Sequence, residues 1–317
     1  MKLFLGKKFL FILGIFVAYF MWVTFPAHAI NFIEDFSHPE SITIDSTGQR
    51  IFVSNIGVNM EPSSKDGDGF ISEITANGRL VHKFFTPKGA LNAPKGLAVA
   101  NNILYVADID RIVGFDIESG KQVFELDLSS RISFINDLLA LNEQTLLASA
   151  SDTGKIYQVS LAENQVSILH GCVPGANGIT YDAKTNTIYA VGLGKNFNGK
   201  GGIYEHDLSI SPNKFEQLDV PTGFFDGIAY LDEKHLIYSD WVEIKKPTQG
   251  AIYIYNINTK KLDKLKLPIK VHGPADFYYQ ATTNLLWLPL TLDNRVAILK
   301  LNEILPKLKK YWREETI

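Results

Sequence analysis

The sequence predicts an all-β protein, a six-bladed β-propeller with an N-terminal signal segment and a short C-terminal helix. One short pattern returns six times, and each copy opens an apolar run. The second residues of the copies lie at 40, 95, 136, 177, 226 and 275, so the steps between them are 55, 41, 41, 49 and 49 residues. A repeat of roughly 40–50 residues that consists of strands is typical of propeller blades. Before residue 302 no segment keeps a helical period, and Val, Ile, Tyr and Phe dominate, which favours strands.

The first 29 residues have the pattern of a secretory signal segment. Three lysines precede an apolar run over 9–24, and Ala27-His28-Ala29 matches the small-x-small cleavage rule, which would start the mature chain at Ile30. The alternative is a retained anchor, because the run is close to the ~17-residue minimum for a membrane span. Either interpretation sends the remainder across a membrane and predicts a periplasmic or secreted protein.

Each blade is expected to contain up to four strands. The fourth shows the plan, with strands at 178–181, 187–191 and 202–206 separated by polar or Gly-rich turns. The second strands are expected to begin at Ile51, Leu104, Leu146, Thr187, Ile237 and Leu286. The third strands are expected to begin at Gly69, Arg111, Lys155, Gly202, Ala251 and Arg295. Outer strands such as 122–125 are weaker, as expected at a solvent-facing edge.

Both ends of the propeller have their own prediction. Residues 30–36 are expected to add a strand that closes the ring, and 57–69 to form an extended loop. Apolar residues at helical spacing after Leu301 predict a short helix over 302–317, partly broken at Pro306, which serves as a packing tail or alternatively as a membrane-surface helix. The predicted domains are therefore a signal peptide (1–29), a propeller (30–301) and a helical tail (302–317).

Composition and the absence of certain motifs exclude several classes of function. A net charge of −3 without basic runs makes nucleic acid a poor partner. Cys172 is the single cysteine, so the chain cannot form an internal disulfide; it is interpreted as a small buried hydrophobe, with a reactive thiol as the alternative. Serine-hydrolase elbow, Walker and zinc-helix motifs are absent from the sequence.

Equivalent positions at the starts of the innermost strands converge on the axis of a propeller. Here this ring consists of Glu40, Lys95, Asn136, Asn177, Asp226 and Ala275. Two carboxylates and two amides suit a hard divalent cation, with Ca²⁺ as the first choice. The alternative is that Asn-Gly and Asp-Gly mark turns and that Glu40 is a loop residue. The shared register favours the cation, because carboxylates facing one channel would otherwise repel and take up protons.

On these residues the chain resembles the senescence-marker-protein and gluconolactonase family of six-bladed propellers, over residues from about 36 to 300. The resemblance implies an axial divalent cation, often Ca²⁺. Its expected ligands are a Glu in blade 1, the Asn of an Asn-Asp pair in blade 3, the Asn of an Asn-Gly in blade 4 and the Asp of an Asp-Gly in blade 5. The matching residues are Glu40, Asn136, Asn177 and Asp226.

One position departs from the family. Sugar-lactone hydrolases of the family often carry an Arg two residues before the blade-3 Asn, where this chain has Phe134. A flat apolar ring cannot replace a forked donor, so the substrate is expected to be more apolar than a sugar acid lactone. Trp241 is a further candidate for the substrate mouth, together with Phe224, Phe225 and Tyr189; packing between blades is the alternative for each.

The resemblance implies hydrolysis of lactones or related esters, with the cation as Lewis acid. Asp226 is the first candidate for the general base and His272 the second, with an exposed loop histidine as the alternative interpretation of His272. The expected protein is a monomer that acts on a small molecule and keeps no stable membrane span after signal cleavage. The competing function is a non-catalytic propeller that binds a small ligand or a protein partner, because a fold alone does not decide activity.

Overall fold

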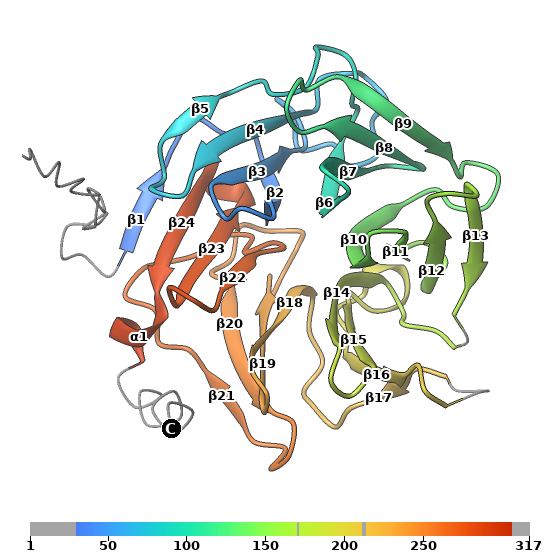
Figure 1. Cartoon of the computed structure of the whole chain (residues 1–317). Coiled ribbons are helices and arrows are strands. Elements are labelled where there is room, and N and C mark those ends of the chain that lie inside the picture. The colour runs from blue at the N-terminus through green and yellow to red at the C-terminus, as the bar shows by residue number, and fades with distance from the viewer. Residues whose placement is uncertain (1–29, 170, 211–213, 306–317) are drawn as a thin grey trace, which may run out of the picture.

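The computed structural model describes residues 30–169, 171–210 and 214–305. In this part of the chain the strands form six antiparallel sheets of four strands each, arranged as blades around a central axis (Figure 1). The predicted six-bladed propeller is therefore confirmed. The predicted signal segment 1–29 and the tail beyond residue 305 lie outside the described residues.

The first three blades follow the chain from the axis outward. Blade 1 consists of β2 (Pro39–Ile44), β3 (Arg50–Asn55), β4 (Phe70–Thr75) and β5 (Leu80–His82). Blade 2 consists of β6 (Pro94–Ala100), β7 (Ile103–Asp108), β8 (Arg111–Asp116) and β9 (Gln122–Asp127). Blade 3 consists of β10 (Ile135–Asn142), β11 (Thr145–Ala150), β12 (Lys155–Ser160) and β13 (Gln165–Ile168).

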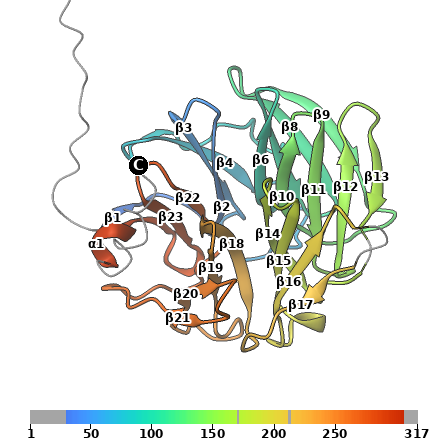
Figure 2. The same cartoon turned by 60° about the horizontal axis from the view of Figure 1, so that its bottom comes forward.

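The remaining blades repeat this order (Figure 2). Blade 4 consists of β14 (Ala176–Asp182), β15 (Thr187–Gly192), β16 (Ile203–Asp207) and β17 (Glu216–Gln217). Blade 5 consists of β18 (Phe225–Asp232), β19 (His235–Asp240), β20 (Ala251–Asn256) and β21 (Leu262–Lys264). Blade 6 consists of β22 (Tyr278–Gln280), β23 (Leu285–Leu290), β24 (Arg295–Lys300) and, from the other end of the chain, β1 (Ile30–Ile33).

The ring is closed by pairing between the two ends of the described chain. Strand β1 runs antiparallel to β24, with Ile30 opposite Leu299 and Ile33 opposite Val296. The predicted closing strand is therefore confirmed. Helix α1 (Leu301–Ile304) follows β24 at the rim, so the predicted C-terminal helix is present but begins one residue earlier than expected. No helix within the described residues is both long and apolar enough to cross a membrane.

The hydrophobic core lies between the blades rather than inside a single layer. Each large apolar cluster joins the facing sheets of two neighbouring blades; for example, Ile51 and Val53 of blade 1 pack with Trp287 and Val296 of blade 6. Each pair of neighbouring blades thus shares one apolar cluster, here called a wedge. Burial of these wedges stabilises the six blades as one unit. Cys172 does not belong to a wedge: it is exposed, so its interpretation as a buried hydrophobe was wrong.

A β-bulge lies at the start of the innermost strand in blades 1 to 5. In β10 the register shifts between Ile135 and Leu138, which frames Asn136 and Asp137. Bulges re-aim side chains and leave a backbone group unpaired. In three blades a serine of the second strand accepts the freed backbone N–H; the donor–acceptor pairs are Ser41–Ser54 (2.9 Å), Asp137–Ser149 (2.9 Å) and Gly227–Ser239 (2.8 Å).

Candidate functional site

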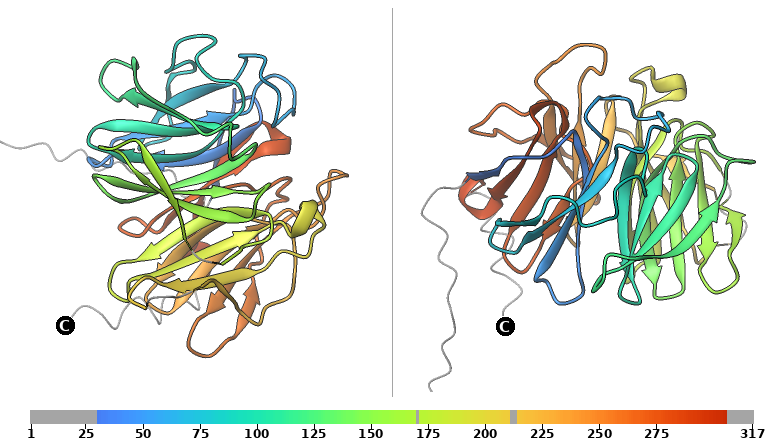
Figure 3. Two further views of the ribbon diagram at one scale, coloured as in Figure 1. Left: turned by 90° about the vertical axis from the view of Figure 1, so that its right-hand side faces the viewer. Right: turned by 90° about the horizontal axis from the view of Figure 1, so that it is seen from above.

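The candidate site lies on the face of the propeller where the innermost strands begin, here called the upper face. Because the strands of a blade are antiparallel, the connections between second and third strands reach the same face. The connection between β19 and β20 and the short turn η1 (Lys195–Phe197) both rise from it, in orange and yellow in the right-hand view of Figure 3. The opposite face, where the innermost strands end, is here called the lower face.

The four proposed cation ligands occupy one register of the innermost strands. Glu40, Asn136, Asn177 and Asp226 are the second residues of β2, β10, β14 and β18, and each is at most 5% exposed. Lys95 and Ala275 hold the same position in blades 2 and 6 and are buried as well. The dipeptides Asn177-Gly178 and Asp226-Gly227 therefore lie within strands and not in turns.

Glycine after the ring residue lets neighbouring inner strands touch. A Cβ added to Gly178 would lie 2.4 Å from the backbone oxygen of Asp226, and one added to Gly227 would lie 2.8 Å from the Cα of Asp276. Such distances leave no room for any side chain. The close approach of blades 4, 5 and 6 draws their ring residues toward the axis.

The electrostatics show that these carboxyl groups share one buried space. Burial raises the pKa of Glu40 well above its ordinary value, and the charges of Asp226 and Asp276 raise it further. Burial likewise raises the pKa of Asp226, and Asp276 adds to the rise, whereas hydrogen bonds from Trp241 and Asn177 oppose it. Groups from blades 1, 4, 5 and 6 thus influence one another across the axis.

Three buried oxygens of the ring have no hydrogen-bond partner among the described residues: Glu40 Oε2, Asn177 Oδ1 and Asp226 Oδ1. Leaving a buried polar atom unpaired costs roughly 1–3 kcal/mol, so such atoms call for a ligand. Carboxylate and amide oxygens are the donors that Ca²⁺ and similar cations take. The residues present therefore fit a hard divalent cation. No group of three or more His, Cys, Asp or Glu suited to a metal occurs in the described part of the chain, so the asparagine amides are essential to this set.

Trp241 approaches the ring by its polar edge. Its indole Nε1–H donates a hydrogen bond to Asp226 Oδ2 at 2.7 Å, and the side chain is buried. Contact of Trp241 with substrate stays a prediction, and the structure places the N–H of Trp241 against a proposed cation ligand. This leaves Oδ1 as the unpaired oxygen of Asp226.

Lys95 brings a positive charge to the ring. Its Nζ donates to the backbone oxygens of Pro62 (2.7 Å) and Ala93 (2.9 Å). Burial lowers the pKa of Lys95 to about 8, although Glu40 and Asp108 oppose the change. The contact with Pro62 ties the long β3–β4 connection to the ring. The ammonium also lies 4.4 Å from the centroid of the Phe134 ring.

Phe134 lines a cavity of about 610 Å³ on the upper face, above blades 2 to 4. Ser151 separates the cavity from the ring: it lines the cavity and accepts a hydrogen bond from Asn136 Nδ2 at 3.2 Å, whereas the ring residues themselves do not line it. Phe197 lies beside Phe134, with ring centroids 5.9 Å apart. Phe197 was not predicted from the sequence, because it lies in a connection between strands and outside the repeated pattern.

His272, the second candidate base, is set apart from these contacts. It is half-buried, and its Nδ1 lies 2.8 Å from Asp293 Oδ1. It lines neither this cavity nor a second cavity, which lies on the axis next to Asp137 and Asp276. The structure therefore gives His272 a carboxylate partner and no described contact with the ring.

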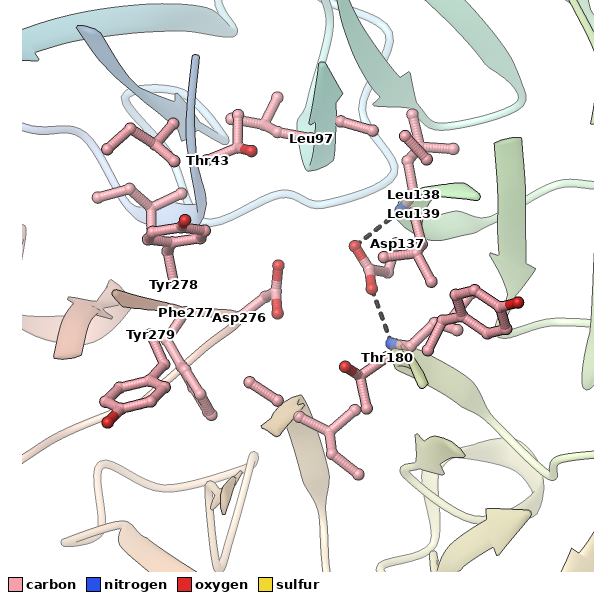
Figure 4. Close-up of a pocket in the computed structure, with 18 of the residues that line it drawn as sticks. Thr43, Leu97, Asp137, Leu138, Leu139, Thr180, Asp276, Phe277, Tyr278 and Tyr279 are labelled. Carbon is pink, nitrogen blue, oxygen red and sulfur yellow. Dashed lines mark hydrogen bonds between the residues drawn. The ribbon is translucent and has the colours of Figure 1, made fainter. Parts of the chain in front are cut away.

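A second pair of carboxylates faces the axis one residue further along the strands. Asp137 and Asp276 point into an axial cavity of about 370 Å³ that opens on the lower face (Figure 4). Asp137 accepts the backbone N–H of Ile179 in the next blade at 2.8 Å, and Asp276 accepts the hydroxyl of Ser41 at 2.6 Å. Both residues directly follow a ring residue in the sequence, Asn136 and Ala275, and this position is the signal that identifies them.

Comparisons with known proteins support the fold and no closer relationship. A scan of protein-family models finds no match, and no curated protein matches the sequence. Hydrazine synthase from Kuenenia stuttgartiensis is similar in structure, with a TM-score of 0.59, 14% identity, and coverage of 87% of this chain and 80% of that chain. The structure of U3-55K is similar with a TM-score of 0.53, 12% identity, and coverage of 82% and 79%. At such low identity these likenesses show a shared propeller fold alone. Membership of the gluconolactonase family stays a prediction.

Proposed function

We propose that the chain is a divalent-cation-dependent hydrolase of lactones or related esters, exported by its N-terminal segment. The observation that carries the proposal is the set of three buried, unpaired oxygens on Glu40, Asn177 and Asp226, in the same strand register as Asn136. These four residues would hold the cation, with Ca²⁺ as the first choice. When bound, the cation would supply Lewis-acid polarisation of the substrate carbonyl.

Asp226 is the proposed general base. Its Oδ2 is fixed by Trp241, whereas Oδ1 has no hydrogen-bond partner in the described part of the chain. In the cation-free protein burial raises the pKa of Asp226, and the charge of Asp276 adds to the rise. Asp226 would take the proton of an attacking water molecule, and Trp241 would hold the carboxylate in place while it does so. His272 is kept as the second candidate base.

The proposal is tested by a hydrolysis screen with lactones and esters of rising chain length. We expect turnover that is lost with a chelator and regained with Ca²⁺, and turnover reduced at least a hundredfold in Asp226→Asn. Asp263→Asn, an exposed aspartate paired with Lys261, is the matched control and should keep its activity. Turnover that survives the chelator, or that is unchanged in Asp226→Asn, would show that the mechanism is wrong.

A second candidate function has its own support. The ring side chains are at most 5% exposed, and Lys95 already carries a positive charge beside Glu40. A closed ring of this kind suits a cation that stabilises the propeller while the rim binds a ligand or partner. Calcium titration with thermal unfolding separates the two: a rise in Tm without hydrolysis of any substrate in the screen favours the non-catalytic propeller.

A further inference from the structure

Two apolar residues of the upper-face cavity have unusual backbone conformations. Among the described residues, the apolar side chains with positive φ are Ile109 (60°), Phe197 (56°) and Val242 (66°). Left-handed backbone is unfavourable for bulky and β-branched residues, and it persists only where the surroundings enforce it. Ile109 and Phe197 both line the cavity, and Val242 follows Trp241, the partner of Asp226. Strained residues of this type therefore gather around the candidate site.

One of the strained connections is hydrogen-bonded next to the ring. The backbone oxygen of Ile109 accepts the N–H of Ile135 at 2.6 Å, and Ile135 directly precedes Asn136. Phe197 belongs to η1, where the preceding Asn196 also has a positive φ. The hydrogen bond at Ile109 thus joins one part of the cavity wall to the strand that carries Asn136.

The cavity wall offers aromatic surface. The rings of Phe134 and Phe197 are tilted by 54° with centroids 5.9 Å apart, which is the spacing of a favourable aromatic pair. The ammonium group of Lys95 lies against the phenyl group of Phe134, but Lys95 does not line the cavity. The contact therefore holds the side chain of Phe134 in place without adding a positive charge to the cavity lining. At about 610 Å³ the cavity has the size of a typical small-molecule site.

The charged groups of the lining disfavour an anion. Asp110 is paired with Lys65 at 2.5 Å, which balances one carboxylate. Asp152 accepts the backbone N–H and the hydroxyl of Ser133, both at 2.7 Å, and has no cation among its described partners. The lining therefore carries one carboxylate in excess, so a negatively charged substrate would be repelled.

From these observations we propose that the upper-face cavity is a subsite for an uncharged aryl group, with Phe134 and Phe197 as its aromatic walls and Ile109 as its apolar floor. This inference rests on the proposed function, because the aryl group would belong to the ester or lactone that is hydrolysed at the ring. It predicts a preference for aryl-substituted over unsubstituted neutral lactones.

The test compares γ-phenyl-γ-butyrolactone with γ-butyrolactone, which differ by the phenyl group alone. We expect wild type to have the higher kcat/KM for the phenyl compound. In Phe197→Ala and in Phe134→Leu the ratio of the two kcat/KM values should fall about tenfold, equivalent to about 1.4 kcal/mol. Phe84→Ala, which removes an exposed ring outside the cavity, is the control and should keep the ratio. An unchanged ratio in both cavity variants overturns the subsite.

A binding measurement separates failure of the subsite from failure of the proposed function. If neither lactone is hydrolysed, saturation-transfer NMR with γ-phenyl-γ-butyrolactone still tests the cavity. Phenyl-proton signals that are present with wild type and lost with Phe197→Ala support the subsite, whereas no signal with wild type overturns it. Phe197 is only partly buried, so the variant should fold, and a Tm within a few degrees of wild type checks this.

Discussion

At the scale of single residues, the evidence for a cation site is the number of buried oxygens that accept no hydrogen bond. Asp226 has one oxygen fixed by Trp241 and one oxygen that is buried and unpaired. Glu40 and Asn177 each contribute one further unpaired oxygen. A protein interior normally satisfies such atoms, so their coincidence in one ring favours a missing ligand over imperfect packing.

The Trp241→Phe variant tests the support of Asp226. It removes the N–H donor and keeps an aromatic ring of similar shape. We expect Ca²⁺ affinity to fall about 10- to 100-fold, the usual effect of losing a group that orients a metal ligand. Isothermal titration calorimetry measures this change.

Trp287→Phe provides a matched control. Trp287 is fully buried, and its Nε1 has no hydrogen-bond partner, so this variant disturbs packing without touching the ring. Equal Ca²⁺ affinities in wild type, Trp241→Phe and Trp287→Phe would contradict a role for Trp241 in the site.

At the scale of the strand, the bulge and the following glycine act together. The bulge turns the ring residue toward the axis, and Gly178 allows β14 to approach β18 at the position of Asp226. Both features lie within four residues at the start of β14 and of β18. They explain why Asn177 and Asp226, 49 residues apart in the sequence, come from the same register of neighbouring blades.

Gly178→Ala is expected to lower the free energy of unfolding by about 1–3 kcal/mol, the usual cost of overpacking. The added methyl would lie 2.4 Å from the Asp226 backbone oxygen, so β18 must shift and the stabilisation by Ca²⁺ should weaken. Gly48→Ala is the control: no atom lies within 4 Å of its added Cβ, and its φ of 74° costs about 1–2 kcal/mol of backbone strain alone. Urea unfolding with and without Ca²⁺ distinguishes them, because Gly48→Ala should keep the full response to the cation.

At the scale of the whole molecule, the ring is held closed by contacts between the first and last described strands. Ile33 of β1 is buried in the wedge that also contains Trp287 and Ile298. Ile33→Ala should therefore lower the free energy of unfolding by about 2–5 kcal/mol. Val123→Ala, at a residue 56% exposed on an outer strand, should change it by no more than about 0.5 kcal/mol. Similar urea midpoints for the two variants would mean that ring closure contributes little to stability.

The four buried carboxyl groups near the axis, here called the carboxyl cluster, also predict how stability depends on pH. Burial raises the pKa of Asp276 from 3.8 to about 7, and the pKa values of Glu40, Asp137 and Asp226 are raised too. The folded chain then binds more protons than the unfolded chain between these values, so cation-free stability should fall as pH rises from about 4 to 7.

Thermal unfolding in a chelator at pH 5 and pH 7 measures this loss. Ca²⁺ should reduce it, because a cation can replace protons in neutralising the cluster. The window is chosen below the pKa of Lys95, about 8, which acts in the opposite direction at higher pH. A cation-free Tm that stays constant or rises over this range would contradict the prediction.

The repeated pattern predicted the blade number and the register of Glu40, Asn136, Asn177 and Asp226, and the apolar runs between polar turns predicted most strand positions. This was possible because a propeller places equivalent positions of each repeat around one axis. A local sequence pattern therefore predicts which residues, far apart in the sequence, lie close together at the axis. The roles of these residues stay predictions. Cys172 was misjudged because its exposure depends on how a connection between blades lies on the surface.

Other features were decided by the tertiary structure alone. Three hydrogen bonds join connections to the ring or to its neighbours: Trp241 to Asp226, Lys95 to Pro62, and Ile135 to Ile109. The positive φ values of Ile109 and Phe197 likewise belong to connections. Connections do not repeat from blade to blade, and their conformations follow from contacts between segments distant in the chain. The sequence repeat therefore determines the positions of the ring residues, whereas the shape of the upper-face cavity depends on how the connections pack.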